Sequence, residues 1–329
     1  MKKIIFVLSL ICSLSASAQE EKKEEGKFTL SGSVDTYYAT NLSTPSLGTT
    51  GVLSDVTSNG FGLGMANTVF SYEKGKAGVV ADLAFGPRAN AANAYTGAIN
   101  QLYAYYQATE SIKITLGQFN TFYGYEVISP VTNFNYTVSY LFNAGPFSHT
   151  GMKIDYAASE ELSFMIALTN PHGIVDGANT SSDAYQFGFQ TGYKNQYINL
   201  AYGSDGFGFK DVLYLDYTGG LDLSDTFYVG INAAYANSND ADAGYQGAAL
   251  YLQKQFSDSF SLGFRSEFFK TTSSAEDANV SAFTLTGSNT LTENLKLITE
   301  LRYDTSKDRI LIGGKNSVTG LVIAAVYTF

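Results

Sequence analysis

Hydrophobic and polar residues alternate with a period of two along nearly the whole chain after the first 27 residues. The alternation breaks at short intervals, at turns rich in Gly, Asn, Asp and Ser. A period of two is typical of β-strands that bury one face only. About sixteen such segments of ~10 residues can be delimited, a length that carries a tilted strand across a bilayer. The predicted strands are residues 28–40, 61–72, 77–86, 98–108, 112–119, 147–157, 162–169, 184–194, 197–204, 211–219, 226–237, 244–256, 260–271, 280–291, 295–304 and 317–329.

The connections between these strands alternate between long and short from the first to the last. Residues 41–60, 120–146 and 305–316 form long loops, whereas residues 73–76 form a tight turn. Outer-membrane barrels have long external loops, short periplasmic turns and both chain ends in the periplasm. The order of connections therefore predicts an all-β fold, a transmembrane antiparallel β-barrel of about sixteen strands over residues 28–329, with both termini periplasmic.

The two faces of the predicted strands differ in the way a barrel requires. In residues 162–168 every second residue is apolar, and in residues 295–304 the charged residues share one face. A soluble β-sandwich would also alternate, but its charged face would meet bulk water and its core would lie between two sheets. The asymmetry of the loops favours the barrel. The residues that we assign to the lumen face are His149, Lys153, Asp155, Arg265, Glu267, Lys296, Glu300 and Arg302.

The first 18 residues have the layout of a secretory signal peptide. Two lysines precede an apolar run over residues 4–14, and Ala16-Ser17-Ala18 is a small-residue cleavage site. Residues 19–27 then form a short charged tail that we expect to be solvated in the periplasm. Together with the barrel pattern, the signal peptide predicts the outer membrane of a Gram-negative bacterium.

Composition and charge set further limits. The chain has 24 Tyr, 23 Phe, 32 Gly and no Trp, a composition that suits strands with crowded positions. Cleavage removes two lysines and leaves 18 basic against 30 acidic residues, a net charge of −12 that argues against nucleic acid as a partner. The only cysteine, Cys12, lies in the signal peptide, so the mature chain has no disulfide.

One stretch interrupts the alternation for much longer than the others. Alternation stops after Phe119 and resumes at about Phe147, and the interval holds four Asn and seven Tyr or Phe. Long structureless loops are uncommon in compact folds and tend to be functional. Because seven exposed rings would form a sizeable apolar patch, we expect the loop 120–146 to fold inward against the wall and narrow the channel.

The same stretch carries short motifs in a fixed order. They are Gly117-Gln118-Phe119, Gly124-Tyr125-Glu126-Val127-Ile128, Asn133-Phe134-Asn135-Tyr136, Ser139-Tyr140-Leu141-Phe142, Gly145-Pro146-Phe147 and His149-Thr150-Gly151. In this order they resemble the β-barrel porin-2, or OmpL-like, family of Gram-negative outer membranes. The close match covers residues 117–151, and the remainder matches in its strand-and-loop architecture. The resemblance implies a porin-like channel, brings no catalytic residues and does not name the solute.

No motif in the chain indicates catalysis, a cofactor or a metal. The two histidines, His149 and His172, are too few for a His-based metal site, and no nucleophile motif accompanies them. We expect no enzyme activity and no cofactor. Two functions remain: a porin for passive diffusion of small hydrophilic solutes, or a non-channel barrel that acts as an adhesin or surface-binding protein. The expected partners are outer-membrane lipids, small hydrophilic solutes and the barrel-assembly machinery, and a homo-oligomer is left open.

Two single residues attract specific hypotheses. Glu126 is the only charged residue of the inward loop. Opposite basic wall residues it would set a transverse field across the path, or it would pair with one wall cation and anchor the loop. Phe329 ends the chain on an alternating strand, which is similar to the assembly signal of outer-membrane barrels.

Overall fold

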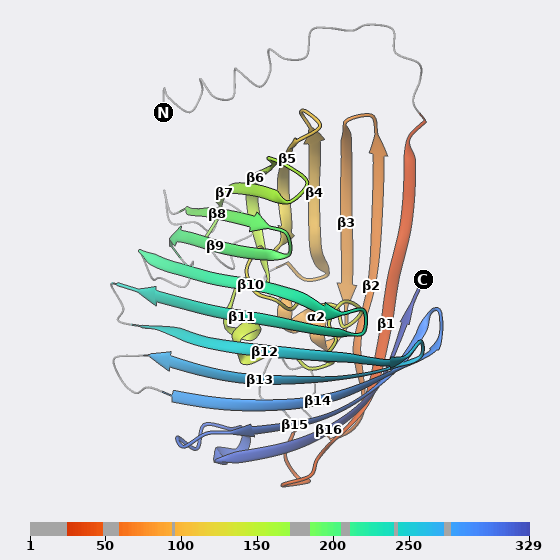
Figure 1. The fold of residues 1–329 in the computed structure, drawn as a ribbon, viewed down its shortest axis with the longest axis vertical. Coiled ribbons are helices and arrows are strands. Elements are labelled where there is room, and N and C mark those ends of the chain that lie inside the picture. The colour runs from red at the N-terminus through yellow and green to blue at the C-terminus, as the bar shows by residue number, and fades with distance from the viewer. Residues whose placement is uncertain are drawn as a thin grey trace, which may run out of the picture.

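The computed structural model describes residues 25–48, 59–93, 96–171, 185–204, 211–239, 243–272 and 278–329. The predicted signal peptide and His172 lie outside these residues. Sixteen strands close into one antiparallel barrel, in which each strand pairs with its neighbours in sequence and β1 pairs with β16 (Figure 1). The predicted strand number and antiparallel strand order are therefore confirmed.

The strand bounds agree with the alternation pattern to within one or two residues at nearly every end. The strands are β1 (Lys27–Asn41), β2 (Gly60–Lys74), β3 (Ala77–Phe85), β4 (Ile99–Gln107), β5 (Ile112–Asn120), β6 (Ser148–Ala157), β7 (Leu162–Thr169), β8 (Gln186–Tyr193), β9 (Gln196–Gly203), β10 (Val212–Ser224), β11 (Phe227–Ser238), β12 (Ala243–Ser257), β13 (Phe260–Thr272), β14 (Ala278–Thr292), β15 (Leu295–Thr305) and β16 (Ser317–Thr328). The described parts of the connections contain the short helical turns α2 (Pro87–Ala92), α3 (Tyr140–Ala144) and the 3-10 turn η3 (Ile312–Gly314).

The largest error of the sequence prediction is the end of β10. The strand was predicted to stop at Gly219 and to turn over residues 221–225, but its pairing with β11 continues to Ser224. In the sequence, Gly219 and Gly220 indicate a strand end at this point. In the structure a Cβ at Gly219 would lie 1.9 Å from the Gln196 side chain, and one at Gly220 would lie 1.7 Å from the Tyr228 hydroxyl. The glycines therefore make room, within a continuous strand, for the Gln196 side chain on the outer face and for the Tyr228 side chain in the lumen.

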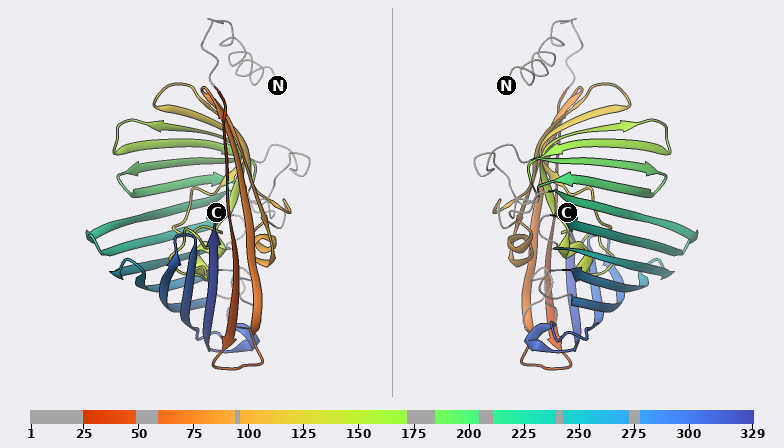
Figure 2. Two further views of the ribbon diagram at one scale, coloured as in Figure 1. Left: turned by 90° about the vertical axis from the view of Figure 1, so that its right-hand side faces the viewer. Right: turned by 90° about the vertical axis from the view of Figure 1, so that its left-hand side faces the viewer.

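The two sides of the wall have the expected chemistry. Large apolar side chains are exposed around the outside, on successive strands; examples are Leu116, Ile166, Phe187, Ile198, Ile231, Leu285, Leu301 and Ile323. Because the strand number is even, β1 begins and β16 ends at the same end of the barrel, and the two strands lie next to each other (Figure 2). Within the described part of the chain, no helix is long and apolar enough to cross a membrane.

The packed core lies inside the barrel, between the wall and the loop that joins β5 to β6. Tyr136 of this loop is fully buried against Tyr37 of β1, Ile298 of β15 and apolar residues of β16. A second cluster joins Ile128, Val138 and Phe142 of the loop to Met65 of β2, Ala84 of β3 and Ala89 of α2. The helix α3 accordingly lies inside the ring of strands (Figure 1), whereas α2 lies beside β2 and β3 (Figure 2). The apolar inner face of β16 follows from this, because the loop covers it.

Candidate functional site

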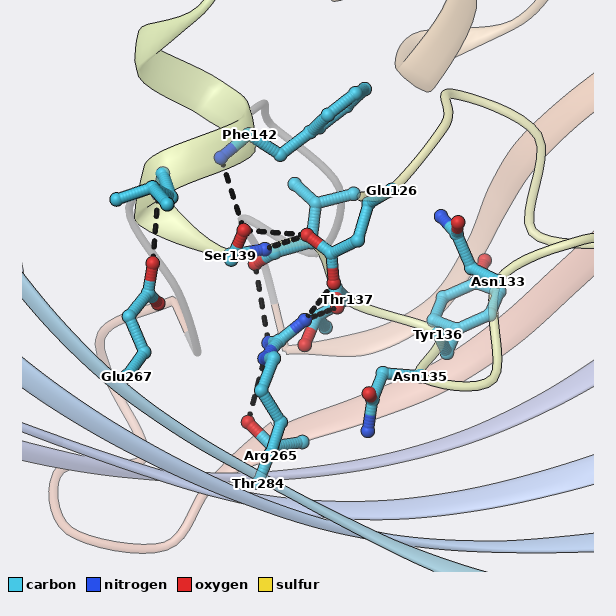
Figure 3. Close-up of polar contacts among 12 residues, drawn as sticks. Glu126, Asn133, Asn135, Tyr136, Thr137, Ser139, Phe142, Arg265, Glu267 and Thr284 are labelled. Carbon is cyan, nitrogen blue, oxygen red and sulfur yellow. Dashed lines mark hydrogen bonds and ion pairs between the residues drawn. The ribbon is translucent and has the colours of Figure 1, made fainter. Parts of the chain in front are cut away.

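The feature that dominates the lumen is the loop 121–147, and its most enclosed part is the central segment, residues 136–141. This segment has non-helical backbone until α3 begins at Tyr140, and its side chains are almost entirely buried. Buried backbone N–H and C=O groups need partners. Charged side chains of the wall and of neighbouring loops provide them instead; Arg265 and Glu267 of the wall are shown in Figure 3.

Three carboxylates accept the backbone N–H groups of the central segment. Glu300 of β15 accepts from Tyr136 N–H (2.8 Å) and from Thr137 N–H (3.1 Å). Glu267 of β13 accepts from Tyr140 N–H (3.0 Å) and Leu141 N–H (2.7 Å) at the start of α3. Glu126 accepts from both the backbone N–H (2.7 Å) and the hydroxyl (2.6 Å) of Ser139. Hydrogen bonds to an ionised acceptor are the stronger kind, so these contacts hold the segment firmly.

Three arginines donate hydrogen bonds to carbonyl groups of the same segment. Arg88 of α2 donates to the Tyr136 carbonyl (3.0 Å) and lies over the Tyr136 ring. Arg265 of β13 donates to the Thr137 carbonyl (2.7 Å), and Arg302 of β15 donates to the Val138 carbonyl (2.7 Å). The segment is thus bound along both edges of its backbone by side chains of alternating charge. We call this arrangement the charged clasp: Glu126, Glu267, Glu300, Arg88, Arg265 and Arg302.

The charges of the clasp are also paired with each other. Arg265 Nη1 lies 2.5 Å from Glu126 Oε1, and both side chains are almost completely buried. Because the other oxygen of Glu126 accepts from Ser139, neither of its oxygens faces open lumen unbound. Arg302 Nε donates to Asp304 Oδ1 at 2.7 Å. A buried ion pair of this kind is costly to break by removing one partner.

Two tyrosines extend the clasp to further carboxylates. Tyr136 donates its hydroxyl to Asp35 of β1 (2.5 Å), and Tyr140 donates its hydroxyl to Asp304 of β15 (2.9 Å). Burial, and after it the neighbouring Asp304 carboxylate, raises the pKa of the Tyr140 phenol. The phenol therefore stays protonated and remains a donor at physiological pH.

Three further rings of the loop fill recesses where the wall has glycine. A Cβ at Gly188 of β8 would lie 2.5 Å from the Phe122 ring, and one at Gly230 of β11 would lie 2.5 Å from the Tyr125 hydroxyl. The same holds for Gly263 of β13, where the Phe134 ring would lie 2.2 Å from a Cβ. These inward-facing glycines let the loop approach the wall more closely than any larger residue would.

A solvent-filled chamber remains beside the loop. It consists of two adjoining cavities of about 500 and 320 Å³ between loop residues 130–135 and the inner faces of β10–β15. The rim of the chamber includes the short β10–β11 and β12–β13 turns, at the end of the barrel where the short turns lie. The residues that line both cavities are Val131, Asn133, Phe134, Asp222, Tyr228, Gln253 and Lys296.

The predicted lumen residues fall into two groups. Glu126, Arg265, Glu267, Glu300 and Arg302 come together in the charged clasp and are buried. The others lie outside it. His149 is buried next to Thr121 (3.1 Å from Nε2 to Oγ1) and stacks on the Phe122 ring. Lys153 and Asp155 pair with each other at 2.9 Å, partly exposed, and Lys296 is exposed on the wall of the chamber. Phe329 is half exposed at the end of β16, where its backbone pairs with Gly32.

Three charged residues of the site, Asp35, Asp216 and Arg88, are not singled out from the sequence, whereas Asp304 falls on the charged face of residues 295–304. Asp35 and Asp216 lie on inward faces, and strict alternation along β1 and β10 would have identified them. Asp216 holds the loop by accepting from Gly124 N–H (3.0 Å). Arg88 lies in a loop without alternation, so the sequence carries no comparable signal for it. Among the described residues, no three or more His, Cys, Asp or Glu gather as a metal site would require.

Solved structures with the same fold include a porin and an outer-membrane protein. An anion-selective porin from Comamonas acidovorans is 13% identical with a TM-score of 0.64, and the alignment covers 93% of this chain and 100% of that one. OmpT of Vibrio cholerae is 12% identical with a TM-score of 0.61, covering 95% and 100%. A trimer form of the same OmpT is 14% identical with a TM-score of 0.59, covering 93% and 100%. Identities this low establish the fold alone.

Sequence comparison assigns the family. No curated protein matches the chain. The family model described as "Putative beta-barrel porin-2, OmpL-like" matches residues 27–329, which is the whole barrel from the first residue of β1. The resemblance in residues 117–151 therefore extends over all sixteen strands, and the chain belongs to this family of porin-like outer-membrane β-barrels.

Proposed function

We propose that the protein is a non-enzymatic porin through which small hydrophilic solutes diffuse passively across the outer membrane. The observation that carries the proposal is the combination of a sixteen-stranded barrel with an inward loop that leaves a polar chamber unfilled. A barrel of this strand number is wide enough for an aqueous channel. The loop narrows it instead of filling it with apolar side chains.

Within this function the charged clasp is the part that fixes the width of the path. Glu126 and Arg265 are bound to each other and to the loop backbone, and both side chains are almost completely buried. This geometry favours the anchor interpretation of Glu126 over a transverse field. Of the charged residues predicted to face the lumen, the exposed Lys296 and the partly exposed pair of Lys153 and Asp155 are available to passing solutes.

The orientation and assembly follow the same proposal. The short turns and both ends of the chain face the periplasm, and the loops after β1 and β15 face the cell exterior.

Phe329 completes the lipid-facing side at the end of β16 and serves as the assembly signal. Phe329→Ala should lower the yield of heat-modifiable barrel in the outer membrane, and an unchanged yield would exclude this role. OmpT occurs in a trimer form, and cross-linking in intact membranes would show whether this chain also associates.

Planar-bilayer recording of the purified protein tests the channel. Steady conductance steps are the expected result, and a liposome-swelling series with solutes of graded size should then give a sharp size limit. A barrel that folds but conducts nothing would contradict the proposal and would support an adhesin or surface-binding role.

A further inference from the structure

We infer that the chamber beside the loop is a binding site for a neutral saccharide of one or two rings. The inference rests on the proposed channel function and adds a substrate class to it. The chamber is of the size that takes small ligands, since such sites measure about 300–1,000 Å³, and its larger cavity measures about 500 Å³.

The inner end of the chamber is an aromatic ledge. The Tyr125 ring stacks on the Tyr251 ring of β12 with centroids 4.1 Å apart, and its hydroxyl donates to the Tyr228 hydroxyl of β11 at 3.0 Å. Phe134 lines both cavities close by. Flat rings that already hold each other in place offer the C–H face of a pyranose a surface to stack on, with little entropy lost on binding.

Polar groups face the ledge and have their hydrogen-bonding capacity free. Gln253 of β12, Asp222 of β10 and Lys296 of β15 line both cavities. In the described part of the chain none of these three side chains has a hydrogen bond or an ion pair, in contrast to the charged clasp a few residues away. An amide, a carboxylate and an ammonium together offer both donors and acceptors, which is the pattern that vicinal hydroxyl groups can satisfy.

The charge balance selects neutral ligands. Asp222 and Lys296 cancel in the larger cavity, and Glu126, which also borders it, is paired with Arg265. Nearer the rim, Asp225, Asp258 and Lys254 add one net negative charge. An acidic sugar would be repelled there, whereas a neutral sugar loses little by entering. The geometry therefore favours neutral saccharides over anionic ones.

Calorimetric titration of the full-length barrel in detergent tests the site. Glucose, galactose, maltose, lactose and sucrose are the neutral probes, galacturonate is the anionic probe and glycylglycine is a zwitterion. At least one neutral sugar should bind, and more tightly than the two charged probes. Tyr228→Ala and Gln253→Ala should each weaken that binding by about tenfold. Tyr197→Ala is the matched control, since Tyr197 faces inward on β9 but does not border the chamber.

The outcomes separate this inference from the channel itself. Absence of binding by all five sugars, tighter binding of glycylglycine or galacturonate, or equal losses in the Tyr197→Ala control would overturn the saccharide site. Each variant is first checked for heat-modifiable migration, so a misfolded barrel is not mistaken for a lost site. If the same preparation conducts but binds no sugar, the channel stands without the site. If it binds sugar but does not conduct, the site stands and the channel function fails.

Discussion

Two neighbouring parts of one loop are held in opposite ways. In the central segment, residues 136–141, the backbone groups are bound by six charged side chains, and the surroundings are fully buried. Residues 130–135 are held mainly from within the loop: the Asn133 side chain accepts from Val127 N–H (2.9 Å) and donates to the Val127 carbonyl (2.6 Å). This part borders the chamber, where Gln253 and Lys296 are free.

The difference separates structural charges from functional ones. A buried charge that is bound to the loop backbone and to a counter-charge is out of reach of a solute, and its burial is tolerable only because it is paired. A charge on the chamber wall is solvated and can exchange water for a ligand. Position on the inward face of a strand therefore does not by itself make a residue pore-lining, and the partners of its polar atoms decide its role.

The largest effect should follow from breaking the clasp at its ion pair. Arg265→Met leaves Glu126 buried without a counter-charge and the Thr137 carbonyl without its donor. We expect a loss of about 3–5 kcal/mol in the free energy of unfolding, measured by urea titration in detergent, and faster proteolysis within the loop. Lys153→Met breaks a partly exposed pair with Asp155 and should cost less than about 1 kcal/mol. Equal losses in the two variants would show that the clasp is no more structural than a surface pair.

An intermediate effect should follow from filling a glycine recess behind the loop. Gly263→Val drives a side chain into the Phe134 ring and should cost about 1–3 kcal/mol. The double variant Gly263→Val with Phe134→Ala should recover part of that loss, because the ring is gone. Gly287→Val on β14 is the control, since a Cβ there meets its nearest neighbour, Phe260, at an ordinary 3.5 Å. If the control is as damaging as Gly263→Val, close packing of the loop is not the cause.

The smallest effect on stability, but the clearest on permeation, should come from the chamber. Lys296→Gln removes an exposed charge and should change the free energy of unfolding by no more than about 0.5 kcal/mol. It should shift the reversal potential in a salt gradient toward cation preference. Glu126→Gln should show the opposite pattern: it should lower the free energy of unfolding by weakening the anchoring of the loop, but leave the ion preference nearly unchanged. A shift in selectivity from Glu126→Gln in a fully stable barrel would restore the transverse-field hypothesis.

The sequence could predict the wall because the wall repeats. Alternation with a period of two places each side chain on one face, and the same rule applied sixteen times fixes strand number, order and lumen face. The end of β10 was wrong because Gly219 and Gly220 are ambiguous locally: only the side chains of Gln196 and Tyr228, on neighbouring strands, show why glycine is needed there.

The clasp could be anticipated only in part. The aromatic content of residues 120–146 indicated an inward loop, and Glu126, Arg265, Glu267, Glu300 and Arg302 were assigned to the lumen. Their partners could not be assigned, since Tyr136 and Glu300 are 164 residues apart in the chain. Arg88 could not be identified, because its loop has no alternation that would predict the direction of its side chain. The folding of α3 onto Glu267 likewise depends on a contact 126 residues away.

The measurement that tests the account most directly is single-channel conductance of the intact protein beside a variant that lacks residues 126–140. The deletion removes Glu126 and most of the central segment but leaves all sixteen strands. We expect the deletion variant to insert as a folded barrel, to conduct more than the intact protein and to admit larger sugars in liposome swelling. Unchanged conductance in a correctly folded deletion variant would show that the loop does not narrow the path, and would contradict the account.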